Sequence, residues 1–137
     1  MLRFTRQGGL IANDVVAALR GTPMNSTSAR MILQWSVPSA ESRPIASFLQ
    51  GLMVSISAEP SCLSCRLCTD VGPATIISYV EEWKSEDDLK RQLKSERFAA
   101  LAELMEHASQ PPSIEFVVGD TSRGSDYAEE VRMNVRR

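Results

Sequence analysis

The sequence predicts an α+β domain in which strands and helices alternate in the order β-α-β-β-α-β. Three observations predict it. A run of β-branched and aromatic residues over Thr75–Trp83 leads directly into a helix start at Ser85. Apolar residues recur at helical spacing over residues 43–56. A Gly72-Pro73 turn joins two candidate strands into a hairpin.

The first strand is predicted over Arg30–Val37, where alternate residues are apolar, and Pro38 ends it. Arg43-Pro44 is expected to open the first helix, since proline is tolerated in a first helical turn. Glu59-Pro60 is expected to end that helix. Its apolar face comprises Ile45, Phe48, Leu49, Leu52 and Ile56.

The predicted hairpin pairs Cys62–Asp70 with Thr75–Trp83. Both faces of the second of these strands carry apolar bulk, which predicts cover on both sides. Alternation divides its residues into two sets. Ile76, Ser78, Val80 and Glu82 share one face, and Ile77, Tyr79, Glu81 and Trp83 share the other.

The second helix is predicted to start with a pair resembling a capping box, Ser85 with Asp88. Ser95 can cap a second helical segment, so a break is expected over Ser95–Arg97. Pro111-Pro112 stops the helix, and Ser113–Val118 forms the fourth strand.

This order is the ferredoxin-like arrangement, a four-stranded antiparallel sheet with two helices on one face. The other face of the sheet remains bare although it carries apolar side chains. An apolar surface of this kind normally marks an interface. We therefore expect a homodimer in which two sheets pack face to face.

Residues 30–119 form the predicted domain. Residues 1–29 are expected to be an arm or leader, and residues 120–137 a polar C-terminal tail. Within that tail, Tyr127, Val131 and Val135 suggest a short helix or a closing arm.

The 137 residues favour one domain, and a net charge of −2 gives no reason to expect nucleic acid or an anionic membrane as a partner. No apolar run approaches the roughly 20 residues that span a bilayer. The N-terminus makes a poor secretory signal. We expect a cytoplasmic protein, where its three cysteines stay reduced.

The spacing Cys62-x-x-Cys65-x-x-Cys68 is a weak zinc or iron–sulfur signal. A regular strand places Cys62 and Cys68 on one face and Cys65 on the other, which argues against a shared metal. We therefore expect no metal, and treat the cysteines as small buried hydrophobes.

The stretch YVEEWKSEDDLKRQLKSERF, together with EPSCLSCRL and the element order, resembles the antibiotic biosynthesis monooxygenase (ABM) family of dimeric α/β-barrel proteins. The resemblance covers roughly residues 31–120. It implies a cofactor-independent monooxygenase that holds a small aromatic, polyketide-like or quinol substrate between sheet and helices. Gln92 and Arg97 stand where the family often has histidines, and Gln92 argues against haem.

The resemblance implies Trp83, Tyr79 and Gln92 as candidate catalytic residues. It implies substrate-binding roles for Arg97, Glu82, Phe98 and Trp35. Each has a simpler interpretation: the aromatics as core or dimer-interface residues, Arg97 on a solvated helix face, and Glu82 as a rim carboxylate. The single histidine, His107, is expected to be structural or exposed.

Two other functions stay open. A non-catalytic dimer that binds a small apolar ligand or serves as an interaction module accounts better for the missing histidines. A redox or metal protein built on the cysteines ranks last.

Overall fold

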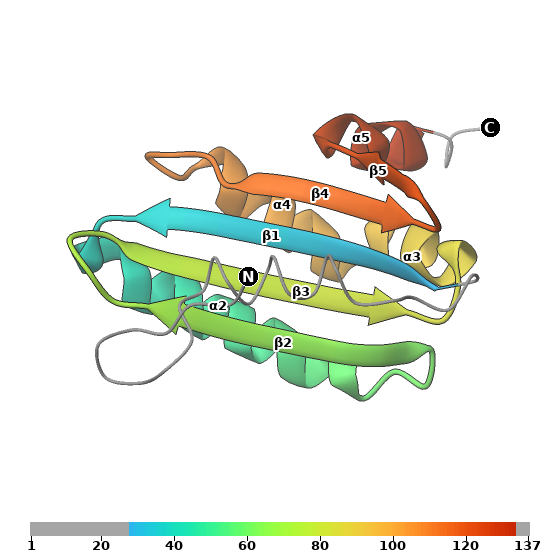
Figure 1. Ribbon diagram of the computed structural model, residues 1–137, viewed down its shortest axis with the longest axis horizontal. Coiled ribbons are helices and arrows are strands. Elements are labelled where there is room, and N and C mark those ends of the chain that lie inside the picture. The colour runs from blue at the N-terminus through green and yellow to red at the C-terminus, as the bar shows by residue number, and fades with distance from the viewer. Residues whose placement is uncertain (1–27, 134–137) are drawn as a thin grey trace.

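The computed structural model describes residues 28–133. Figure 1 shows one layer of helices against one face of a single sheet. The elements, in chain order, are β1 (Ala29–Val37), α2 (Ser39–Ser57), β2 (Cys62–Asp70), β3 (Thr75–Trp83), α3 (Glu86–Leu93), α4 (Glu96–Glu106), β4 (Ser113–Val118), β5 (Thr121–Arg123) and α5 (Ser125–Met133).

The sheet has five strands in the order β2-β3-β1-β4-β5, and every neighbouring pair is antiparallel. The first four strands reproduce the ferredoxin-like arrangement expected from the sequence. The ranges predicted for β2, β3 and β4 match the structure. The break at Ser95 is also present, because α3 ends at Leu93 and α4 begins at Glu96.

The expected strand count of four was wrong. Gly119 adopts a left-handed φ of 58°, a conformation that glycine reaches without strain, and the chain turns back there to pair β5 with β4. Val118 pairs with Thr121 across this turn. A strand of three residues is too short to leave an alternating pattern in the sequence.

The expected start of the first helix was also wrong. Helix α2 begins at Ser39, so Pro44 lies inside it. Pro44 is the sixth residue of the helix, beyond the first turn, so it cannot donate the usual intrahelical hydrogen bond to the carbonyl of Ala40. Ahead of the proline, the backbone N–H of Glu41 donates to Pro38 O at 2.9 Å, and Ser42 Oγ donates to Ser39 O at 2.8 Å.

The main core lies between the sheet and the helices. Its largest fully buried side chains include Trp35, Trp83, Tyr79 and Phe116. A second, smaller cluster of Ile32, Val80 and Val117 lies on the opposite face of the sheet, and Ile32 and Val80 are buried. Apolar side chains therefore occupy both faces of the central strands, as the sequence predicted.

Helix α5 packs on the end of the domain through Tyr127, Ala128 and Val131, which join the main core. The Tyr127 ring lies 5.2 Å from that of Phe116, and Arg132 Nη1 donates to Leu93 O at 2.6 Å. The short helix expected in the tail is thus present.

Val135 and nearly all of the predicted N-terminal arm lie outside the described residues. Within residues 28–133, no helix has the length and apolarity to cross a membrane.

Candidate functional site

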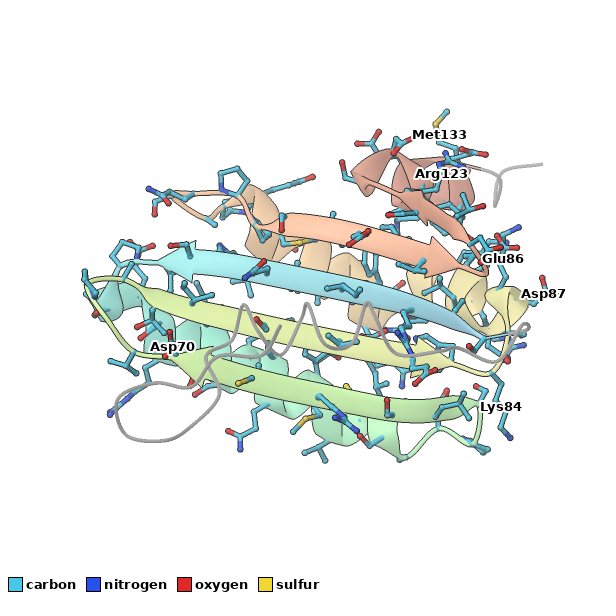
Figure 2. All side chains as sticks on the ribbon, viewed as in Figure 1. Asp70, Lys84, Glu86, Asp87, Arg123 and Met133 are labelled. Atoms are coloured by element: carbon cyan, nitrogen blue, oxygen red, sulfur yellow. The ribbon has the colours of Figure 1, made fainter. Side chains whose placement is uncertain are left out.

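A buried carboxylate lies at the end of β3. Glu81 is fully buried on the face that also presents Tyr79 and Trp83 to the helices. Tyr79 Oη donates to Glu81 Oε2 at 2.7 Å, and Trp83 Nε1 donates to Glu81 Oε1 at 3.0 Å. One strand thus supplies a carboxyl group and two aromatic donors that fix its orientation. Figure 2 shows Lys84, Glu86 and Asp87 at this end of the sheet, and Asp70 at the other.

Burial raises the pKa of Glu81 to about 7, because the surrounding core disfavours its charged form. The hydrogen bonds from Tyr79 and Trp83, and the positive charge of Arg97, limit this rise. Burial also holds the pKa of Tyr79 far above its ordinary value, so this phenol remains a donor. Glu81 can therefore exchange a proton near neutral pH, which general acid–base catalysis requires.

A β-bulge in β2 brings two cysteines to this cluster. The register shifts between Cys62 and Ser64, so Cys62 pairs with Trp83 and Cys65 pairs with Glu81. Directly paired residues point to the same face, so both cysteines face the helices. The expectation that Cys62 and Cys65 point to opposite faces was wrong, because it assumed a strand without a bulge.

Burial disfavours the reactive thiolate form of both cysteines. Cys65 Sγ donates to Tyr79 Oη at 3.3 Å, and burial raises the pKa of this thiol to about 12. Burial raises the pKa of Cys62 as well. Among the described residues, no group of three or more His, Cys, Asp or Glu side chains could hold a metal ion.

The junction between α3 and α4 brings Gln92 and Arg97 together. Ser95 caps α4 by accepting from Phe98 N at 3.2 Å, and its hydroxyl donates to Gln92 O at 2.6 Å. This tight turn lets Arg97 Nη2 donate to Gln92 Oε1 at 3.0 Å. Gln92 and Arg97, two of the candidate residues from the sequence, therefore contact each other directly.

Arg97 is only weakly held on its other side. Its Nη1 donates to Ser55 Oγ at 3.3 Å, and its Nη2 lies 3.4 Å from Glu59 Oε1. The side chains of Arg97 and Glu59 are 30% and 42% exposed, so the cluster meets solvent here. The interpretation of Arg97 as a solvated surface residue agrees with its partly exposed side chain. It does not account for the hydrogen bond from Arg97 to the buried Gln92.

Two buried donors of this cluster lack a partner. Gln92 is 3% exposed, and its Nε2 finds no acceptor in the part of the chain that the structure describes. The same holds for the Nε of Arg97. Leaving a buried donor unpaired costs about 1–3 kcal/mol, so each such atom in a native fold needs an explanation.

Glu82 and Trp35, which were singled out from the sequence, lie away from the cluster around Glu81. Glu82 is on the opposite face of the sheet, where it pairs with Arg30 at 3.6 Å, so the structure does not bring it to the Trp83 cluster. Trp35 pairs with Ile77, six residues along β3 from Trp83, which separates the two by about 20 Å. The indole N–H of Trp35 donates to Gln110 O at 2.8 Å.

Phe98 is buried under the guanidinium of Arg132, whose Cζ lies 6.0 Å from the ring centroid. His107 is exposed beyond the C-terminus of α4, with Nδ1 2.8 Å from Glu103 O. This agrees with the interpretation of His107 as structural or exposed.

Glu81 is the residue that sequence reasoning passed over. Strand alternation had already placed it beside Tyr79 and Trp83. A carboxylate that lies between two aromatic residues on the core-facing side of a strand must be neutral or hydrogen-bonded. This pattern in the sequence indicates Glu81, and not Glu82, as the candidate functional carboxylate. The approach of Ser55 and Glu59 from α2 to Arg97 depends on long-range packing and leaves no local pattern.

A separate groove of about 710 Å³ lies between α4, the segment 108–114 and α5. Apolar side chains form most of its wall, Phe98 among them. The others include Ala102, Met105, Pro112, Ile114 and Met133. Trp83, Tyr79 and Gln92 do not line it.

The profile of the family described as "Antibiotic biosynthesis monooxygenase" matches residues 29–104, from the start of β1 nearly to the end of α4. The chain belongs to this family. The ABM match ends ahead of β4, so β5 and α5 lie outside it. A comparison with curated proteins found no match.

Solved structures share the fold at low identity. A candidate antibiotic biosynthesis monooxygenase from Caulobacter crescentus is 20% identical, with a TM-score of 0.57 over 67% of this chain and 89% of that one. A conserved Methanosarcina mazei protein is 18% identical, with a TM-score of 0.58 over 67% and 92% of the chains. A protein of unknown function from Bacteroides thetaiotaomicron, a possible oxidoreductase, is 11% identical, with a TM-score of 0.57 over 73% and 99%. At these identities the likeness establishes the ABM fold alone.

Proposed function

We propose that this protein is a cofactor-independent monooxygenase of the ABM type that acts on a small aromatic, polyketide-like or quinol substrate. The observation that carries the proposal is the buried Glu81 carboxyl, whose pKa lies near 7 and whose oxygens are oriented by Tyr79 and Trp83. In this proposal Glu81 is the proton acceptor in a chain that has Gln92 and Arg97 where the resembled family often has histidines.

In the proposed reaction Glu81 accepts a proton from an acidic C–H or hydroxyl group of the substrate. The resulting anion transfers electrons to O₂, and a carbon–oxygen bond forms. The substrate as a whole loses two hydrogen atoms, from carbon or from carbon and hydroxyl, and gains one oxygen atom; the second oxygen atom leaves with both hydrogens as water. The substrate supplies all the electrons, so the balance needs no external reductant.

Other residues of the cluster have distinct proposed roles. Tyr79 and Trp83 are positioning residues for Glu81, and Trp83 also offers an aromatic face to the substrate. Gln92 and Arg97 supply donors for a substrate oxygen. The substrate enters on the side of Arg97 and Glu59, which is the partly exposed side of the cluster. The active protein is proposed to be a homodimer that pairs through the sheet face away from the helices, where Val117 is partly exposed.

Oxygen consumption tests the proposal, with a panel of anthrone-like phenols and quinols as substrates. General base catalysis contributes about 10²–10⁴-fold in rate, so Glu81→Gln should lower turnover by at least about a hundredfold. Trp83→Phe should lower turnover through lost positioning. Glu96→Gln makes the same change at an exposed carboxylate and should leave turnover unchanged.

Glu82→Gln then separates the two adjacent carboxylates. A loss of turnover in Glu82→Gln, with activity retained in Glu81→Gln, would refute the assignment of the base. Wild-type turnover no higher than that of Glu81→Gln and Trp83→Phe would refute the oxygenase itself.

The apolar groove between α4 and α5 favours a second candidate function, binding of a small apolar ligand without chemistry. Its volume of about 710 Å³ lies within the usual range for ligand sites, about 300–1,000 Å³. A bound ligand should raise the melting temperature without forming a product. Ala102→Trp, which fills the groove, should abolish that rise.

A further inference from the structure

The sheet face away from the helices contains buried side chains that no described helix covers. Ile32 and Val80 are 2% and 4% exposed on this face, and Ser78 is 2% exposed. Figure 1 shows the helices of residues 28–133 against the opposite side of the sheet. On an uncovered sheet face, neighbouring strands shield only the flanks of a side chain and leave its outer end in water. The burial of these three residues therefore requires a further cover.

The buried area has the outline of a single helix. It follows β1 and β3 and includes Arg30, which is 4% exposed and whose Nη2 lies 3.6 Å from Glu82 Oε2. On the flanking strands, Arg66 of β2 pairs with Val80 but is exposed, and Val117 of β4 is only partly buried. Two adjacent strands are about 10 Å wide, which matches the roughly 10–12 Å diameter of a helix. A second sheet packed face to face would cover the flanking strands as well.

Residues 10–20 carry the sequence pattern that such a cover requires. Ile11, Val15 and Leu19 recur every four residues, which places them on one face of a predicted helix. Asn13 falls on the other side of that helix. The segment is therefore predicted to be amphipathic, with one apolar face to bury.

Length and connection also favour this segment. A helix of ten residues is about 15 Å long, and the buried area extends about 13 Å along β3, from Ser78 to the partly buried Glu82. Residues 21–28, GTPMNSTS, have the composition of a turn and join the segment directly to β1. Eight residues reach at most about 28 Å, enough for the chain to fold back over the start of β1. Residues 134–137, by contrast, follow α5, which packs on the helix side, and they include one apolar residue.

We propose that residues 10–20 dock as an amphipathic helix on the face formed by β1 and β3, with Ile11, Val15 and Leu19 against Ile32 and Val80. The sheet face is thus a docking surface for a segment of the same chain. A homodimer that pairs through this face needs the same surface, so the segment must leave before two copies can pair. The inference rests on the burial of the sheet face and does not depend on the proposed reaction.

The accessibility of position 80 tests the docking. Val80→Cys in the full chain provides a thiol on this face, and iodoacetamide at about pH 8 alkylates it at a rate that peptide mass spectrometry measures separately from the native cysteines. The protein is kept at a concentration at which light scattering gives the monomer mass. The thiol should react slowly in Val80→Cys alone. Adding Val15→Asp or Leu19→Asp should raise the rate about tenfold or more, because a carboxylate is costly to bury against apolar side chains and favours release of the segment.

Ala17→Asp is the matched control. It introduces the same charge on the side of the predicted helix opposite Val15, so the thiol should stay protected. Positions 15, 17 and 19 lie outside the main core of residues 28–133, and circular dichroism establishes that each variant is folded. In the wild-type background, Val15→Asp should also lower the concentration at which a dimer forms several-fold, and Ala17→Asp should not.

Three outcomes would overturn the inference. Rapid alkylation of monomeric Val80→Cys would show that the face is open. Protection that survives both Val15→Asp and Leu19→Asp would show that something other than this segment covers it. Protection that disappears on dilution, as a dimer dissociates, would assign the face to a second copy. Turnover enters none of these measurements, so the docking proposal and the proposed function fail separately.

Discussion

Glu81 should make the stability of the folded protein depend on pH in a defined direction. Its pKa rises from an ordinary 4.5 to about 7 on folding. Each pKa unit corresponds to about 1.36 kcal/mol, so the contribution of this one group changes by about 3 kcal/mol between its two protonation states.

The sign follows from proton affinity. The folded state holds the Glu81 proton more tightly than the unfolded state does, because the pKa is higher in the folded state. The stabilisation is therefore fully present below about pH 4.5. It is lost as the pH rises through about 7, above which the loss is complete.

Urea unfolding of the wild type and Glu81→Gln, followed by tryptophan fluorescence at several pH values, measures this term. Other titrating groups affect both proteins alike, so the difference between their unfolding free energies isolates Glu81. Relative to Glu81→Gln, the wild type should lose about 3 kcal/mol between pH 4.5 and pH 8. A difference that stays constant across this range would refute the raised pKa, and with it the proposed proton acceptor.

Three further outcomes are expected. Ser95→Ala should lower the unfolding free energy by about 1 kcal/mol because it removes the cap of α4; urea denaturation measures this, and an unchanged midpoint would contradict it. Iodoacetamide at about pH 8 should leave Cys65 unmodified in the folded protein, since its pKa is about 12; peptide mass spectrometry checks it, and rapid labelling would count against the buried thiol. Val117→Lys should convert a homodimer to monomers by burying charge at the proposed interface; light scattering decides, and an unchanged dimer mass would exclude this face.

The elements of the fold could be predicted from the sequence because each carried a local signal. The β-branched run of β3, the helical spacing in α2 and the cap at Ser95 are properties of neighbouring residues. Strand β5 could not be predicted in the same way, since its pairing depends on one glycine conformation and only three residues.

The candidate site was predictable only in part. Trp83, Tyr79 and Gln92 were named from a family pattern, and all three do lie around Glu81 or Arg97. The choice of Glu82 over Glu81 failed because it weighed position beside Trp83 above the face of the strand. The contacts of Arg97 with Ser55 and Glu59 join residues about forty positions apart, which no local pattern encodes.

The bulge in β2 has a consequence for how the length of this strand can change. Leu63 is the extra residue between Cys62 and Ser64, and it resets the parity of everything on its N-terminal side. Deleting that single position would remove the bulge and leave Cys62 opposite Trp83 in a regular pairing, while the pairing of Cys65 through Asp70 stayed as it is. A one-residue deletion at this strand start is therefore absorbed without moving a side chain out of the Glu81 cluster. This makes the bulge a place where the chain can lose one residue while keeping both the cluster and the sheet.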